Sequence, residues 1–326
     1  MLCFTSQAQD PVYSQFYNAP TLINPAFAGN TRGANVAINY RNQWPSIDNA
    51  YTTYSLAYDQ KWNKNSGLGL YVTSDDAGDG AIKTTKLAGI YSYKIRIQND
   101  LYIKGALDVA FGQTRLDQSK LVFLDNLDPQ YGLNSPGGVE LQTAEVLSSS
   151  PSRSYLDISS GFLLYSPQFY GGLSFKHMNS PSIDFIDDVT GEEGILPLRW
   201  SAIVGTQIDL QQGGTYRNKN NSTTFISPNL LFVKQQDFWQ INAGAYLNVD
   251  QIFGGLWYRH TAHNSDAIIF SAGVKSGIFK IGYSFDYTIS GLGINSGGSH
   301  EIGIVLNFDK YMPKESKYND CMMLFR

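Results

Sequence analysis

The sequence has no apolar run of about 18 residues, the length that a helix needs to cross a bilayer, so a membrane-spanning helix is excluded. Charge is also scarce. Charged residues make up 16% of the chain, and 24 basic against 28 acidic side chains leave a net charge of -4. This balance gives no reason to expect nucleic acid or an anionic membrane surface as a partner.

The first residues, MLCFTSQAQD, resemble the end of an export signal. Ser6 and Ala8 stand at the small-residue positions of a cleavage site, so we expect residues 1–8 to be a signal remnant and the mature chain to start near Gln9. If Cys3 leaves with the signal, Cys321 is unpaired and no disulfide is possible. A lipidated Cys3 is the alternative, which the bulky Phe4 after it disfavours.

Glycine and aromatic residues are abundant, with 31 Gly, 21 Tyr and 18 Phe, as in barrels with aromatic girdles and many tight turns. The clearest pattern lies near the end of the chain, at 279–289 and 298–309. Apolar and polar residues alternate strictly in both stretches, which indicates strands with two different faces. Their length of about ten residues and their tyrosine content suit a tilted span of a bilayer.

The same alternation continues through most of the chain and predicts an all-β fold, a transmembrane outer-membrane β-barrel over 33–309. We expect about 14 antiparallel strands, at 33–44, 50–61, 66–74, 81–97, 100–116, 153–166, 168–178, 196–210, 222–235, 238–249, 251–261, 266–276, 278–289 and 298–309. An even number is typical of single-chain bacterial outer-membrane barrels, with both termini in the periplasm.

The connections between these strands alternate in length. The expected periplasmic turns at 62–65, 98–99, 167, 250 and 277 are short, and only 211–221 is long. The expected outer loops include the two longest connections of the chain, 117–152 and 179–195. This asymmetry is typical of an outer-membrane barrel in that orientation.

Alternation also assigns each side chain to a face of the wall. The residues expected to meet lipid are Val36, Ile38, Tyr40, Leu68, Leu70, Val72, Ile103, Leu107, Val109, Ile268, Phe270 and Val274. The charged residues expected to point inward are Arg41, Asp59, Lys94, Arg96, Lys104, Asp108, Lys275, Lys280, Asp286 and Glu301. A lumen with charges of both signs can form internal ion pairs.

Residues 9–32 do not alternate, and Pro11, Pro20 and Pro25 argue against a strand there. Around 14 strands leave room inside a barrel. We therefore expect this irregular N-terminal segment, or part of the 117–152 loop, to plug the lumen, with a periplasmic contact as the alternative role of 9–32.

Candidate chemistry is weak throughout the chain. Ser299, His300 and Glu301 suggest a hydrolytic triad, but strand geometry turns His300 away from the other two. His260 and His263 lack a third zinc ligand. The Asp-rich turn at 75–80 fails the calcium-loop pattern at the third and twelfth positions. The sequence therefore predicts no catalytic residue, no cofactor and no metal site.

The outer loops hold the residues best suited to a partner. In the loop at 117–152 these are Asp125, Asp128 and Tyr131, and in the acidic loop at 179–195 they are Asp187, Asp188, Glu192 and Glu193. An ordinary solvated loop and a calcium site are the alternative interpretations of the acidic loop.

Three stretches of the sequence are distinctive: DPVYSQFYNAPTLINPAFAG at 10–29, YRNQWP at 40–45 and YSFDYTISGLGINSGGSHEIGIVLNF at 283–308. Together they resemble the PorP/SprF family of outer-membrane proteins. The tail at 310–326 is longer than the resemblance leads us to expect. We assign it to a periplasmic tail without a role.

The resemblance implies a part in the type IX secretion system of Bacteroidota. It implies retention or export of a secreted surface protein with a type B C-terminal sorting domain, such as an adhesin of gliding motility. A periplasmic peptidoglycan-binding component is a further implied partner. A diffusion channel or small-molecule transporter is the alternative function, and an enzyme in the barrel wall comes third.

Overall fold

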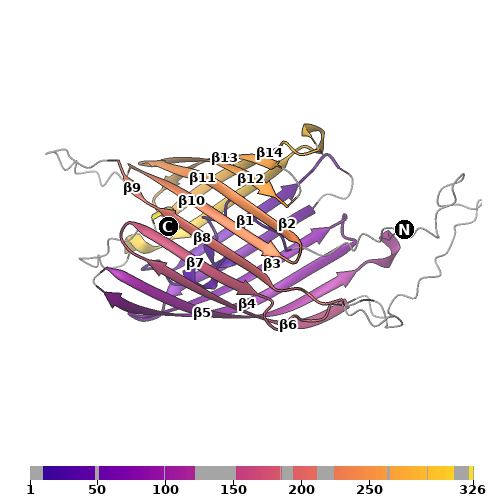
Figure 1. The fold of residues 1–326 in the computed structure, drawn as a ribbon, viewed down its shortest axis with the longest axis horizontal. Helices are drawn as coiled ribbons and strands as arrows, with labels where there is room; N and C mark the ends of the chain where they lie inside the picture. The colour runs from indigo at the N-terminus through magenta and orange to yellow at the C-terminus, as the bar shows by residue number, and fades with distance from the viewer. Residues whose placement is uncertain are drawn as a thin grey trace, which may run out of the picture.

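The computed structural model of the chain shows one β-sheet that closes on itself (Figure 1). It describes residues 10–47, 51–98, 100–121, 152–183, 185, 194–210, 224–262, 265–291, 293–311 and 323–325. The strands are β1 (Asn35–Gln43), β2 (Tyr51–Lys61), β3 (Ser66–Ala77), β4 (Ile82–Gln98), β5 (Leu101–Leu116), β6 (Ser152–Tyr165), β7 (Phe169–Lys176), β8 (Arg199–Thr206), β9 (Ile208–Asp209), β10 (Thr224–Gln235), β11 (Phe238–Val249), β12 (Ile252–Thr261), β13 (Ser265–Ser276), β14 (Phe279–Thr288) and β15 (Ser299–Asn307).

Each strand pairs antiparallel with its neighbours, and the last strand closes the ring on the first. Asn35 of β1 lies opposite Asn307 of β15, and Gln43 opposite Ser299. Because β8 and the short β9 both pair with β10, the result is a closed antiparallel barrel of 14 strands. This confirms the predicted fold.

The predicted strand ranges agree closely with the observed ones, with two differences. The stretch predicted as a single strand at 196–210 begins later, at Arg199, and Gln207 interrupts it between β8 and β9. β3 continues to Ala77, where its register partner is Ile82, so the Asp-rich stretch partly belongs to a hairpin.

Short 3-10 helices lie between and beyond the strands. They are η1 (Pro20–Leu22), η2 (Pro25–Phe27), η3 (Gln118–Lys120), η5 (Ile294–Ser296), η6 (Asp309–Tyr311) and η7 (Met323–Phe325). None of the helices in the described part of the chain is long and apolar enough to cross a membrane.

The two ends of the barrel differ. At one end β11 and β12 are joined through Asp250, and β13 and β14 through Gly277, both in left-handed backbone conformation with φ of 55° and 64°. Such conformations allow two-residue hairpins. We call this the short-turn end, where β1 also begins and β15 ends. The opposite end, called the long-connection end, carries the connections from β5 to β6 and from β7 to β8.

The outer surface of the wall is apolar. Of the residues expected to meet lipid, seven are exposed large apolar side chains: Ile38, Leu70, Val72, Leu107, Val109, Phe270 and Val274. The other five are partly exposed. An exposed apolar belt on a closed barrel is what a bilayer requires.

Most of the charged residues expected to point inward are buried: Arg41, Asp59, Lys104, Asp108, Lys280, Asp286 and Glu301. Lys94 and Lys275 are partly exposed, and Arg96 is exposed. Arg96 differs because β4 is longer than its neighbour. Ser66, the first residue of β3, pairs with Tyr93, and the Lys94 N–H still donates to the Asn65 carbonyl, but the end of β4 extends past the start of β3.

A charge on the apolar belt should destabilise the barrel. Ile304 lies between Ile38 of β1 and Ile281 of β14, both exposed to the outside. Ile304→Arg should lower the free energy of unfolding by about 2–4 kcal/mol, because the guanidinium would enter hydrocarbon. Urea unfolding from lipid vesicles measures the change, with Ile304→Leu as the control. Equal stability of the two variants would contradict a lipid-facing position.

Candidate functional site

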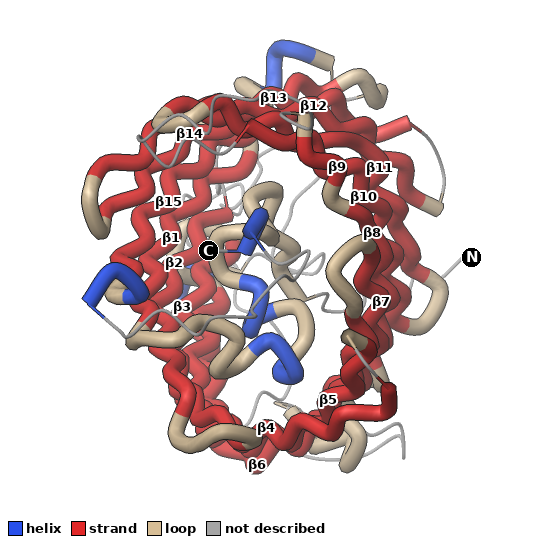
Figure 2. The backbone as a smooth tube through the Cα atoms, turned by 90° about the vertical axis from the view of Figure 1, so that its left-hand side faces the viewer, coloured by secondary structure: helices blue, strands red, loops and turns tan. Residues whose placement is uncertain are grey.

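The interior of the barrel is occupied by the chain's own N-terminal residues. Residues 10–32, called the lumenal segment, lie inside the ring of strands (Figure 2). The segment includes η1 and η2. Every residue from Tyr13 to Ala28 is buried. Its contacts with the wall therefore form the main internal surface of the protein, and we treat them as the candidate functional site.

The lumenal segment runs the length of the barrel. Asp10 contacts Lys86, His177, Arg199 and Gln235, all near strand ends at the long-connection end. At the opposite end the Gly29 N–H donates to Asp59 and the Gly33 N–H to Asp309. Asp10 and Asn307 therefore lie at opposite ends, whereas both termini were expected on one side.

Asp10 belongs to a cluster of charges, the Asp10 cluster, formed with the partly exposed Lys86 and the buried Asp157, His177 and Arg199. His177 lies between two carboxylates, with Nε2 2.5 Å from Asp10 Oδ2 and Nδ1 2.8 Å from Asp157 Oδ2. Lys86 Nζ lies 3.2 Å from Asp10 Oδ1. Burial raises the pKa of Asp10, but Lys86, His177 and Arg199 outweigh it and hold the pKa well below its usual value. The carboxylate is therefore ionised at neutral pH.

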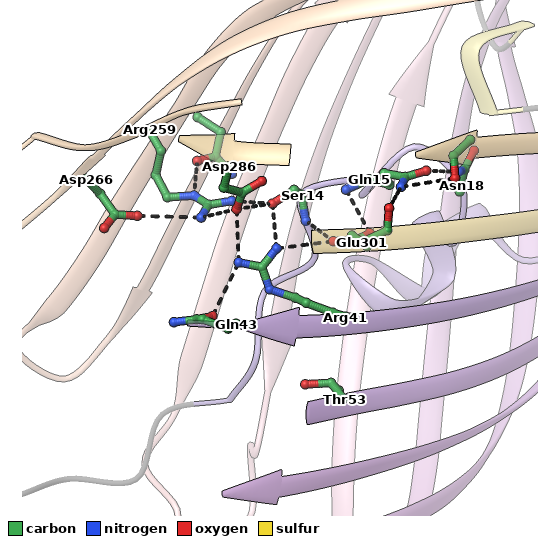
Figure 3. Close-up of polar contacts among 12 residues, drawn as sticks. Ser14, Gln15, Asn18, Arg41, Gln43, Thr53, Arg259, Asp266, Asp286 and Glu301 are labelled. Atoms are coloured by element: carbon green, nitrogen blue, oxygen red, sulfur yellow. Dashed lines mark hydrogen bonds and ion pairs between the residues drawn. The ribbon is translucent and has the colours of Figure 1, made fainter. Parts of the chain in front are cut away.

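A second group of buried charges, the Ser14 clasp, holds the lumenal segment four residues further on (Figure 3). The Ser14 hydroxyl accepts hydrogen bonds from Arg41 at 2.7 Å and Arg259 at 2.6 Å, and donates to Asp286 at 2.7 Å. Glu301 accepts from the backbone N–H groups of Ser14 and Gln15 at 2.8 and 3.0 Å.

The charges of the Ser14 clasp also pair with one another across four strands. Asp286 of β14 lies 3.0 Å from Arg41 of β1 and 2.9 Å from Arg259 of β12. Arg41 also lies 3.3 Å from Glu301 of β15. Removing one partner of such a buried group leaves a charge without compensation, which costs about 3–5 kcal/mol.

Aromatic packing follows the clasp. Tyr17 stacks on Trp257, with ring centroids 5.4 Å apart, and meets Tyr246 edge-on at 5.2 Å. Phe16 meets the same indole edge-on at 6.0 Å. Trp257 is fixed in turn because its Nε1–H donates to Asn229 at 2.8 Å.

Beyond the aromatic residues, the wall binds the backbone of the lumenal segment. Lys176 donates to the Leu22 carbonyl at 2.5 Å, and Lys104 donates to the Ala28 carbonyl. Ser92 donates to the same Ala28 oxygen at 2.8 Å. The lysine ammonium groups thus bind backbone carbonyl oxygens. The second half of the lumenal segment, from Leu22 to Ala28, is therefore held largely through its backbone.

Asn24 is fitted between two glycines of the wall. Its Nδ2 donates to the carbonyls of Phe162 at 3.0 Å and Leu173 at 3.1 Å. A Cβ at Gly161 would lie 2.1 Å from Asn24 Oδ1, and one at Gly172 would lie 2.8 Å from Asn24 Nδ2. Both positions need glycine because the segment approaches the strands so closely.

None of the partner-binding residues predicted in the loops can be placed. Asp125, Asp128 and Tyr131 lie in 122–151, and Asp187, Asp188, Glu192 and Glu193 in 186–193, all outside the described residues. Those seven positions stay a prediction. His263 also lies outside the described part of the chain.

The suspected triad and calcium loop have structural roles. Ser299 and Glu301 are buried on the inner face, whereas the His300 Nδ1 lies 2.7 Å from the Tyr283 hydroxyl on the outer face. Asp75 accepts from the Thr53 hydroxyl, and Asp76 from the Gly80 N–H. Within the described ranges no three His, Cys, Asp or Glu side chains gather as metal ligands.

Sequence reasoning placed Arg41, Asp286 and Glu301 on the inner face but missed their partners. Asp10, Ser14, His177 and Arg259 were not singled out, because alternation carries no information about which strand lies opposite. One sequence signal could have indicated these contacts. It is the combination of inward-facing charges of both signs with a polar N-terminal segment in which apolar and polar residues do not alternate.

The comparisons with known proteins give one sequence match and several likenesses of fold. A family model described as "Type IX secretion system membrane protein PorP/SprF" matches residues 5–306. No curated protein matches the chain at a significant level.

Among solved structures, a FadL homologue of Pseudomonas aeruginosa is 10% identical, with a TM-score of 0.47, covering 89% of this chain and 94% of that one. The toluene transporter TbuX of Ralstonia pickettii is 10% identical, with a TM-score of 0.46, covering 89% and 92%. The KdgM porin is 8% identical, with a TM-score of 0.37, covering 84% and 99%. At these values the likenesses carry no argument about function.

A methyl group at Gly161 should loosen the lumenal segment without changing a charge. Gly161→Ala forces Asn24 to move and breaks its two bonds to the wall, which should cost about 1–3 kcal/mol. Amide hydrogen exchange of residues 20–28 should become about 5–150 times faster. Gly89→Ala is the control, since its nearest neighbour atom is 3.9 Å away. Equal exchange in both variants would contradict the close fit.

Proposed function

Because the chain belongs to the PorP/SprF family of type IX secretion system membrane proteins, we propose that it binds a secreted surface protein carrying a type B C-terminal sorting domain. It is an outer-membrane β-barrel, and its proposed task is to retain this client at the cell surface or to assist its export. This is a role in binding, without catalysis.

The observation that carries the proposal is the occupied lumen. A diffusion channel needs a continuous water-filled path lined by polar groups. Here the charged side chains of the Asp10 cluster and of the Ser14 clasp bind the lumenal segment instead. A barrel whose lumen is filled by its own chain suits a protein that binds a partner through its loops and does not let solutes pass through the membrane.

The proposed orientation places the short-turn end in the periplasm and the long-connection end at the cell surface. Long extracellular loops and short periplasmic turns are the rule for outer-membrane barrels. In this orientation the tail that follows Asn307 begins in the periplasm, where a peptidoglycan-binding component would meet it. Asp10 then lies at the cell-surface end, because the lumenal segment threads the barrel.

The client is proposed to dock on the loops of the long-connection end. These loops carry the predicted contact residues Asp125, Asp128, Tyr131, Asp187, Asp188, Glu192 and Glu193. Loops contribute little to the barrel ladder, so evolution is free to adapt them to a partner. Their acidity favours a client with a basic contact surface.

Neutralising the acidic loop should weaken client retention and leave the barrel folded. The variant replaces Asp187 and Asp188 with Asn and Glu192 and Glu193 with Gln. Affinity purification of the tagged barrel from native outer membranes, with quantitative mass spectrometry, measures the co-purified protein that ends in a type B sorting domain. We expect its recovery to fall about tenfold or more, as for a loss of 1.4 kcal/mol in binding.

The matched control removes charge at the other end of the barrel. Asp100→Asn and Asp250→Asn lie at short turns, where Asn tolerates their positive φ. Client recovery should be unchanged in this control. Recovery of the unmodified barrel without any such client, from membranes in which other complexes survive, would contradict the proposed function.

A further inference from the structure

The short-turn end of the lumen contains a segment from the far end of the sequence. Residues 323–325 lie inside the barrel, close to the point where the C-terminus is marked in Figure 2. Leu324 is 0% exposed and Phe325 is 4% exposed. The Phe325 ring lies 4.6 Å from the ring of Phe27 and 5.1 Å, edge-on, from the ring of Tyr170.

Lys280 of the wall contacts this segment, and Lys275 is the register partner of Lys280. Lys280 Nζ donates to the Leu324 carbonyl at 3.0 Å, and it lies 5.1 Å from the Tyr17 ring and 5.3 Å from that of Phe253. Lys275 Nζ lies 5.9 Å from the Phe253 ring and 5.8 Å from the Tyr246 ring. Aromatic faces attract both ammonium groups.

The arrangement of these lysines is electrostatically unusual. Lys275 of β13 and Lys280 of β14 are direct register partners, and like charges in such pairs repel. Within the described part of the chain, no carboxylate pairs with either of them. By contrast, Arg41, Lys86, Arg199 and Arg259 each lie within 4.0 Å of an acidic side chain.

A buried ammonium group without an anion is costly, and Lys280 is buried while its register partner Lys275 is partly exposed. The opposed pair therefore indicates a missing negative charge. The described segment supplies a carbonyl dipole to Lys280 and apolar side chains to the rings. Residues 323–325 therefore fill the apolar part of the site. The described residues bring no carboxylate to the ammonium groups of Lys275 and Lys280, so a carboxylate could still bind there.

We propose that Phe27, Tyr170, Lys275 and Lys280 form a peptide-binding site, and that residues 323–325 occupy it in cis. Its ligand is a polypeptide segment of a partner with two bulky apolar side chains beside a carboxylate. The carboxylate comes from a side chain or from a chain end. The inference rests on the proposed function in that the partner is an exported protein, which would reach this end of the barrel from the periplasm.

The chain's own sequence supplies the probe. It is a fluorescein-labelled peptide copying residues 319–326, with Ser in place of the cysteine. One twin carries a C-terminal amide, and a second carries Asn in place of Asp320. Fluorescence anisotropy with the full-length protein in nanodiscs measures binding, and the twins distinguish the chain-end carboxylate from the side-chain one.

The first comparison is between the intact protein and a variant whose own C-terminal residues no longer fill the site. The double variant Leu324→Ala and Phe325→Ala removes the apolar contacts of the cis occupant. Because a tethered segment competes at millimolar effective concentration, the emptied variant should bind the probe at least about tenfold more tightly than the intact protein. Equal affinity of the two proteins would overturn cis occupancy.

The second comparison removes the charges in the emptied variant. Lys275→Met and Lys280→Met keep the length of the side chain, and each should weaken probe binding about tenfold, as for a lost charge-assisted bond. Lys83→Met, at an exposed lysine of β4, is the control and should bind normally. Heat-modifiable gel migration verifies that each variant is folded.

The proposed ion pair between the lysines and a carboxylate would be overturned by either of two results. One is a probe affinity that neither lysine substitution changes, and the other is an equal affinity of the probe and of both modified peptides. Loss of affinity in one twin identifies the carboxylate that the lysines bind. Failure of client purification alongside normal probe binding would count against the proposed function and leave the peptide site standing.

Discussion

The structure depends on the mutual compensation of buried charges inside the barrel. Asp286 and Glu301 face Arg41 and Arg259 on the inner side of the wall, and all four side chains are buried there. The Ser14 hydroxyl completes the group, because it accepts from both guanidinium groups and donates to a carboxylate. A barrel wall of 14 strands encloses more space than its own side chains fill, so a further segment is needed to bring such charges together.

The two halves of the lumenal segment are held by different means. Near the long-connection end, side chains and N–H groups of the segment meet charged side chains of the wall, at Asp10 and Ser14. Towards the short-turn end, Lys104 and Ser92 of the wall donate to the Ala28 carbonyl. The side-chain contacts of Asp10 and Ser14 select particular residues, whereas the contact with the Ala28 carbonyl accepts any backbone that fits. This difference makes the short-turn end the better place for a second polypeptide to bind.

Much of the wall could be predicted from the sequence, because a strand between lipid and lumen must alternate. The alternation around Ile302 and Ile304 gave both the strand and its outward face, and the position of Glu301 on the inner face followed. Arg96 departs from the pattern because the end of β4 extends past its neighbour. The inner partners could not be predicted, since Ser14 meets Glu301 across 287 positions of the chain and no local pattern encodes that distance. The same holds for Leu324 at Lys280.

The most direct measurement of the central claim is the electrical conductance of the barrel in planar lipid bilayers. The intact protein is compared with a variant that lacks residues 10–28 and keeps every strand. If the lumenal segment fills the barrel, the intact protein shows no steady conductance, and the shortened one shows steady channels of porin-like size. An intact protein that conducts as much as the shortened one would contradict the account.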